Sequence, residues 1–129
     1  MFRRCSVEDK IMTLYDASGR AVAYCDDGET IYLFNGMPVA YFFGDKVYGF
    51  KGQHLGNISD GWRRDNKGLC VFFTENANGG PLKPLKQLMP IKSIKHIRPV
   101  KGVRHVPYVK PANQLSWSSL SGERFFLAV

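Results

Sequence analysis

Residues 31–46, IYLFNGMPVAYFFGDK, and residues 47–62, VYGFKGQHLGNISDGW, are two consecutive copies of one pattern. In each copy a tyrosine stands four residues before a glycine, a phenylalanine two residues before it, and an apolar residue three residues after it. The pattern continues on both sides, and its glycines recur every 16–17 residues as Gly19, Gly36, Gly52 and Gly68. Only the fourth copy lacks the tyrosine and has Arg64 instead. Such repeats predict equivalent units that bury their apolar faces against one another.

Each copy has the signals of a β-hairpin. The repeated glycines follow Ser18, Asn35, Lys51 and Lys67, and Asn-Gly is typical of a type I′ turn, in which both central residues have positive φ. A second set of turn signals lies between the copies, and the stretches between turns are rich in strand-forming Tyr, Phe and Val. We therefore predict an all-β fold of about eight short strands. The four hairpin repeats either close into a ring with pseudo-fourfold symmetry, which is the arrangement that we predict, or form an open meander. Near a common axis the ring would bring together Val22, Val39, Leu55 and Val71.

From Leu82 the chain changes to a strict period of three. LKPLKQLMPIKSIKHIRPVKGVRHVPYVKP (residues 82–111) has an apolar residue at every third position, and the next residue is basic in eight of ten triplets. A strand alternates with period two, and prolines would interrupt an α-helix, whereas polyproline II has three residues per turn. We predict that residues 81–111 (the strap) are extended and wrap around the hairpin body, with the apolar edge on the body and the cations facing water.

The strap also carries the charge. The chain has a net charge of +7, and no acidic residue lies between Glu75 and Glu123. A basic stripe of this kind is typical of a surface that contacts an acidic protein or a polyanion. The candidate anion contacts are Lys83, Lys86, Lys92, Lys95, Arg98, Lys101 and Arg104. The stripe has no interleaved aromatic residues for stacking on nucleic-acid bases, and it could instead serve only to keep a stable accessory domain soluble.

A second candidate site lies where the fourth repeat departs from the pattern. An arginine flanked by carboxylates beside an indole can bind an anion or a sugar. The candidate ligand-binding residues are Asp60, Trp62, Arg64 and Asp65. The competing interpretation is structural, with an ion-paired arginine in a turn that closes the ring. Binding of a small ligand or glycan through the aromatic hairpin surfaces is therefore the functional alternative to an acidic partner.

Nothing in the sequence favours an enzyme. There is no Ser-His-Asp order, carboxylate pair or phosphate-binding glycine loop. The three histidines lack metal-ligand spacing, and the three cysteines contain no Cys-x-x-Cys and are odd in number. Cys25 and Cys70 are best explained as small buried strand residues. We expect a non-enzymatic binding module with no catalytic residues, no metal and no cofactor.

The length of 129 residues fits a single domain. We divide it into an N-terminal extension (1–13), the four-repeat body (14–80), the strap (81–111) and a C-terminal segment (112–129) whose Trp117, Phe125 and Phe126 dock on the body. The first ten residues lack the apolar run of a secretory signal, and no stretch reaches the ~18 apolar residues of a membrane span. We therefore expect a cytoplasmic protein, with homo-oligomerisation left open.

Three short pieces of the chain carry a resemblance to a known family. They are Gly61-Trp62-x-Arg64-Asp65, Gly79-Gly80-Pro81 and Leu120-Ser121-Gly122-Glu123. Together with the Lys-rich period-three tract, they make residues 14–126 resemble the small bacterial proteins called four-fold β-flower proteins. The resemblance implies a fold of four β petals, the same number as the repeats, and it implies no activity.

Overall fold

Eight antiparallel strands form a closed barrel in the computed structural model, which describes residues 11–127. The strands are β1 (Met12–Tyr15), β2 (Ala21–Cys25), β3 (Thr30–Leu33), β4 (Pro38–Phe43), β5 (Lys46–Tyr48), β6 (His54–Ser59), β7 (Trp62–Asp65) and β8 (Cys70–Phe73). Each strand pairs with the next, and β8 returns to β1 through Phe73 and Tyr15. The prediction of an all-β fold of four hairpins is thus confirmed, and the closure excludes the open meander.

The predicted N-terminal extension is only partly described. β1 begins at Met12, two residues before the predicted start of the body. Residues 1–10 lie outside the described part of the chain.

The repeated glycines lie at the tips of the four hairpins, where the turn differs from the predicted one. Gly36 has a φ of +93°, and its N–H donates to the carbonyl of Leu33, three residues earlier. The register shifts between Ile31 and Tyr32, so a glycine turn is combined with a β-bulge. The two consecutive positive φ angles of a type I′ turn occur instead at Asp60 and Gly61, between β6 and β7.

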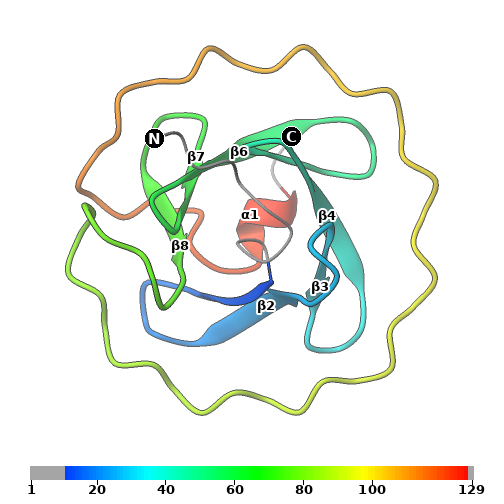
Figure 1. Ribbon diagram of the computed structural model, residues 1–129, viewed down its shortest axis with the longest axis horizontal. Helices are drawn as coiled ribbons and strands as arrows, with labels where there is room; N and C mark the ends of the chain where they lie inside the picture. Colours follow the sequence, from blue (N-terminus) through cyan, green and yellow to red (C-terminus); the bar gives the residue numbers. More distant parts are fainter. Residues whose placement is uncertain (1–10, 128–129) are drawn as a thin grey trace, which may run out of the picture.

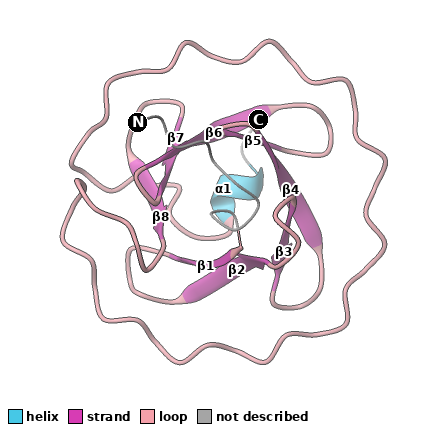
Figure 2. Ribbon diagram, in the orientation of Figure 1, coloured by secondary structure: helices cyan, strands magenta, loops and turns pink. Residues whose placement is uncertain are grey.

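The barrel interior contains the residues predicted to meet near the axis. Val22, Leu55 and Val71 are buried in one cluster, and Val39 packs against it. A short helix, α1 (Arg124–Leu127), lies inside the ring of strands (Figures 1 and 2) and adds Phe125 and Phe126 to the same cluster. The C-terminal segment therefore supplies part of the core that the short hairpins cannot complete by themselves.

The strap circles the barrel outside the hairpin tips (Figure 1), in neither helix nor strand. Backbone N–H groups spaced nine residues apart donate to the carbonyls of the four tip glycines, in the pairs Gln87–Gly19, His96–Gly36, His105–Gly52 and Gln114–Gly68. We call each pair a station, numbered one to four along the chain. A Cβ atom on any tip glycine would stand 1.9–2.2 Å from a carbonyl oxygen of the strap or, at Gly68, from that of Ala112 directly after the strap. The glycine is therefore required both by the turn and by the close approach of the strap.

The predicted orientation of the strap is wrong. Its ten triplet apolar side chains point away from the barrel and are 90–96% exposed: Leu82, Leu85, Leu88, Ile91, Ile94, Ile97, Val100, Val103, Val106 and Val109. The hairpins turn their own apolar side chains into the barrel, so the face that meets the strap offers tyrosine rings and carboxylates instead. Rings and carboxylates attract cations, and the basic side chains therefore lean inward.

The cysteines of the body are buried in strands, as predicted. Cys25 lies in β2 and Cys70 in β8, and neither forms a disulfide. Burial raises the pKa of Cys25 to about 11, so this thiol stays protonated and unreactive at neutral pH. Among residues 11–127, no helix has the length and apolar character needed to cross a membrane.

Candidate functional site

Tyrosine rings under the strap receive its cations. Lys92 Nζ lies 4.3 Å from the centre of the Tyr24 ring, and Lys101 Nζ lies 4.5 Å from that of Tyr41. Such contacts contribute about 0.5–1 kcal/mol each at exposed sites. The tyrosines themselves are buried. The aromatic hairpin surfaces considered for glycan binding are therefore covered by the strap.

Carboxylates of the barrel pair with four of the seven predicted anion contacts. Lys86 Nζ lies 3.0 Å from the Glu75 carboxylate, and Lys95 Nζ lies 2.6 Å from that of Asp26. The hydrogen bond to Asp26 raises the pKa of Lys95. Arg98 and Lys101 both pair with one carboxylate, that of Glu29. Lys83 instead donates to the carbonyl of Ala77.

Arg104, the contact at the third station, has no such carboxylate. Its guanidinium carbon lies 3.6 Å from the centre of the Phe43 ring. Within residues 11–127, Arg104 forms neither an ion pair nor a side-chain hydrogen bond. The charged edge of this guanidinium is therefore available to an external group.

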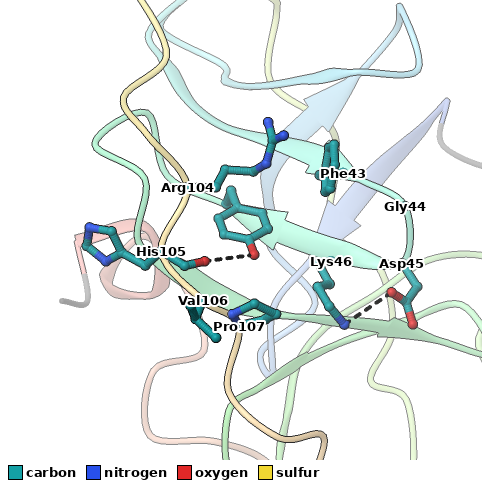
Figure 3. Close-up of a pocket in the computed structure, with 9 residues that line it drawn as sticks. Phe43, Gly44, Asp45, Lys46, Arg104, His105, Val106 and Pro107 are labelled. Atoms are coloured by element: carbon teal, nitrogen blue, oxygen red, sulfur yellow. Dashed lines mark hydrogen bonds and ion pairs between the residues drawn. The ribbon is translucent and has the colours of Figure 1, made fainter.

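A hollow of about 420 Å³ opens beside this arginine (Figure 3). It lies between the β4–β5 turn (residues 43–46) with Tyr48 on one side and strap residues 104–107 on the other. The Tyr48 hydroxyl donates to the carbonyl of His105 at 3.2 Å, which fixes the strap at the edge of the hollow. Lys46 Nζ lies 3.4 Å from its neighbour Asp45. The Arg104 hollow thus combines a free guanidinium with an aromatic ring and aliphatic walls.

The strap is also attached through a buried histidine. The backbone N–H of Tyr108 donates to Nδ1 of His54 at 3.0 Å, and Nε2 of the same ring lies 2.9 Å from the carbonyl of Gly56. These partners select the neutral tautomer with the proton on Nε2. Burial lowers the pKa of His54, and the nearby Lys46 lowers it further.

We expect the protein to lose stability as the pH falls below about 6.5, the ordinary value of an unfolded histidine. The pKa of His54 is lowered in the folded state, so in this window the unfolded chain binds more protons. Full stability is therefore present above the unfolded pKa and is lost as the pH falls through the folded pKa. Urea midpoints between pH 5 and 8 measure this slope. His54→Asn should flatten it and the exposed His96→Asn should not, whereas equal slopes in wild type and His54→Asn would contradict the expectation.

The predicted ligand cluster is engaged inside the chain. The indole N–H of Trp62 donates to the carbonyl of Asn78, and Asp65 accepts the Ser118 hydroxyl at 2.6 Å. Arg64 donates to the carbonyls of Gly68 and Gln114 at the fourth station. All three side chains are buried, and only Asp60 is exposed, in its turn. Arg64 and Asp65 therefore hold Gln114 and the C-terminal segment on the fourth petal, and Arg64 donates to carbonyl groups where the structural interpretation had an ion pair.

Sequence reasoning missed Phe43 and Lys46, which line the hollow. The available signal was the position seven residues after each tip glycine, where the repeats have Asp26, Phe43, Ser59 and Glu75. Phe43 is the one apolar residue at a repeat position that is otherwise polar. Its functional role depends on which strap residue it faces, and the barrel repeat alone does not show how the strap is aligned with the barrel.

Comparison with known proteins identifies a family and nothing more specific. A family model described as "4-fold beta flower protein" matches residues 12–126. Searches of curated proteins and of solved structures found no match.

Proposed function

The chain belongs to the 4-fold beta flower protein family, and we propose that it is a non-enzymatic binding module that holds an acidic protein partner on the outer surface of its strap. The observation that carries the proposal is the ring of ten strap side chains that are 90–96% exposed. Exposed apolar surface of this extent marks interaction sites in soluble proteins. Removing it from water upon association provides the driving force for binding.

The charge of the strap supports an acidic partner. Lys86, Lys95 and Lys101 keep 38–40% of their side-chain surface exposed although they pair with barrel carboxylates. With the chain's net charge of +7, they create a positive field around the apolar ring. Such a field speeds the encounter with an acidic partner and favours it over a basic one. The apolar side chains then provide the contact area.

A protein partner fits this surface better than a nucleic acid. Binding to a phosphate backbone depends on a row of cations that are free to replace counterions. Here four of the predicted anion contacts already pair with carboxylates of the barrel. The outermost groups of the strap are aliphatic, and an acidic protein can cover them with apolar side chains of its own.

An immobilised copolymer of glutamate and tyrosine, which is both acidic and apolar, tests the proposal. We expect the wild type to be retained, and the triple variant Ile91→Ser, Ile94→Ser, Ile97→Ser to bind at least about tenfold more weakly, because it removes three contacts of the order of 1.5–3 kcal/mol each when fully buried. Leu127→Ser is the matched control, since Leu127 is an exposed apolar residue of α1, inside the ring of strands and not on the strap.

Thermal unfolding should be unchanged in the triple variant, because its three side chains are almost fully exposed. Equal retention of the wild type and the triple variant would overturn the proposal. So would retention on heparin that persists above ~0.1 M salt and does not depend on the three isoleucines, because that result assigns a polyanion as the partner.

A further inference from the structure

We propose that the Arg104 hollow recognises a side-chain carboxylate of the partner, from an Asp or Glu that has an apolar neighbour in an acidic polypeptide segment. The inference rests on the proposed function and adds to it a specific contact. Its support is the way in which the third station differs from the other stations around the ring.

The residue seven positions after a tip glycine faces the strap at the next station. The four facing pairs are Glu75–Lys86, Asp26–Lys95, Phe43–Arg104 and Ser59–Asn113. Two pairs are ion pairs, and the last is a neutral hydrogen bond of 3.1 Å. Only at the third station does a strap cation face a residue that cannot accept a hydrogen bond. An external carboxylate there would complete the pairing that stations one and two make internally.

A neighbouring repeat position adds to the positive charge of the third station. Ten residues after the tip glycine, Glu29 of one petal corresponds to Lys46 of the next. Glu29 pairs with Arg98 and Lys101, so it neutralises strap cations beyond the second station. Lys46 instead brings a second cation to the Arg104 hollow, where Asp45 is the only acidic residue of the described lining. The lining therefore carries more positive than negative charge.

The guanidinium of Arg104 is held in a suitable orientation for a carboxylate. Stacking on the Phe43 ring fixes its plane and leaves its N–H edge open for two parallel hydrogen bonds. A side chain that is already ordered loses less conformational entropy on binding. Phe43 is 49% exposed, so the ring itself also contacts whatever enters the hollow.

The groups around the hollow indicate a polypeptide. Val106 lines it, and Val103 precedes Arg104 on the strap, each with 90% of its surface exposed. A polypeptide can place a carboxylate on the guanidinium and an apolar side chain on these valines within a few residues. A polyphosphate has no aliphatic group to pack against the valines, and in this hollow it could pair with only one unpaired arginine. It should therefore bind less well than an acidic polypeptide.

The probe is the tripeptide acetyl-Val-Glu-Val-amide, with acetyl-Val-Gln-Val-amide as its uncharged match. We follow the Arg104 Nε–H and Val106 methyl signals by NMR while titrating the full chain. The glutamate peptide should bind with a dissociation constant of roughly 1 mM, as expected of a few contacts. The glutamine peptide should bind at least about tenfold more weakly, because it lacks the charge-assisted hydrogen bonds.

Four variants separate this site from the rest of the strap. Arg104→Gln should reduce affinity for the glutamate peptide at least about tenfold, whereas Lys95→Gln, the same change at the second station, should leave it within twofold. Phe43→Asp should also abolish binding, because its carboxylate would pair with Arg104 as Asp26 pairs with Lys95. Phe43→Ser, which copies the fourth-station residue Ser59, should weaken binding by only a few fold, because the guanidinium loses the ring that orders it but gains no competing carboxylate.

Equal affinity for the two tripeptides, or equal effects of Arg104→Gln and Lys95→Gln, would overturn the inference. Inorganic phosphate binding as tightly as the glutamate peptide would also overturn it, because the hollow would then accept any small anion. If Arg104→Gln leaves retention on the glutamate–tyrosine copolymer intact while the triple isoleucine variant loses it, the proposed function stands and this inference fails. If both variants bind the copolymer like wild type, the proposed function itself fails.

Discussion

Gly36→Ala is expected to detach the strap at the second station and to lower the free energy of unfolding by about 2–4 kcal/mol. Alanine is strained at the φ of +93° found there. Its Cβ would also stand 2.1 Å from the carbonyl oxygen of Ile94, so the strap must move away. That movement breaks the hydrogen bond from the His96 N–H to the Gly36 carbonyl.

Gly44→Ala is the matched control for this experiment. Gly44 also has a positive φ, +63°, but an added Cβ would meet no atom within 4 Å. The control should therefore show only the backbone strain, about 1–2 kcal/mol. Urea unfolding measures both variants, and amide exchange at His96 should increase only in Gly36→Ala. Equal exchange at His96 in the two variants would mean that the tip glycine does not hold the strap.

Phe125→Ala should cost about 3–5 kcal/mol, the usual range for removing a buried aromatic ring. Phe125 is almost completely buried, and its ring packs edge-on against Phe72 and against Phe126. α1 has only four residues, so it adds to stability through these rings rather than through its own helical hydrogen bonds. A loss of this size corresponds to a fall in Tm of roughly 10–25 °C for a chain of this length.

Leu127→Ala is the control in the same helix, because Leu127 is largely exposed. It should change the free energy of unfolding by no more than about 0.5 kcal/mol. Calorimetry or urea unfolding of the two variants gives the comparison. Similar losses in both would show that α1 is stabilised by something other than insertion of its phenylalanines into the barrel.

The repeat was sufficient to predict the hairpins and their number. The tip glycines and the apolar residue three positions later predicted the positions of the turns, though not their type, and the inward face of the strands. A closed ring of equivalent units needs the same residue types at the same places. Helix α1 could not be predicted, since Phe125 and Phe126 have too few neighbours in sequence to form a helical pattern. Their place is determined by the space that four short hairpins leave between them.

The orientation of the strap was beyond sequence reasoning for a different reason. The period of three separates apolar from basic residues, but it does not say which set faces the barrel. The usual rule places apolar residues inside. Here the rule fails, because Tyr24 and Tyr41 present ring faces to the strap and receive Lys92 and Lys101. The orientation of the strap follows from the residues on the outer surface of the closed barrel, which the repeat pattern does not identify. The Arg104 hollow, which lies between this surface and the strap, could not be predicted for the same reason.

The nine-residue spacing of the stations limits how this fold can evolve. One petal uses 16–17 residues of the barrel and nine residues of the strap, and the two lengths lie far apart in the gene. Duplicating a hairpin alone would leave its tip glycine without a donor, and inserting one residue in the strap would move every later N–H group off its acceptor. Growth or shrinkage of the ring therefore requires two coordinated changes of fixed length, which favours a constant number of petals.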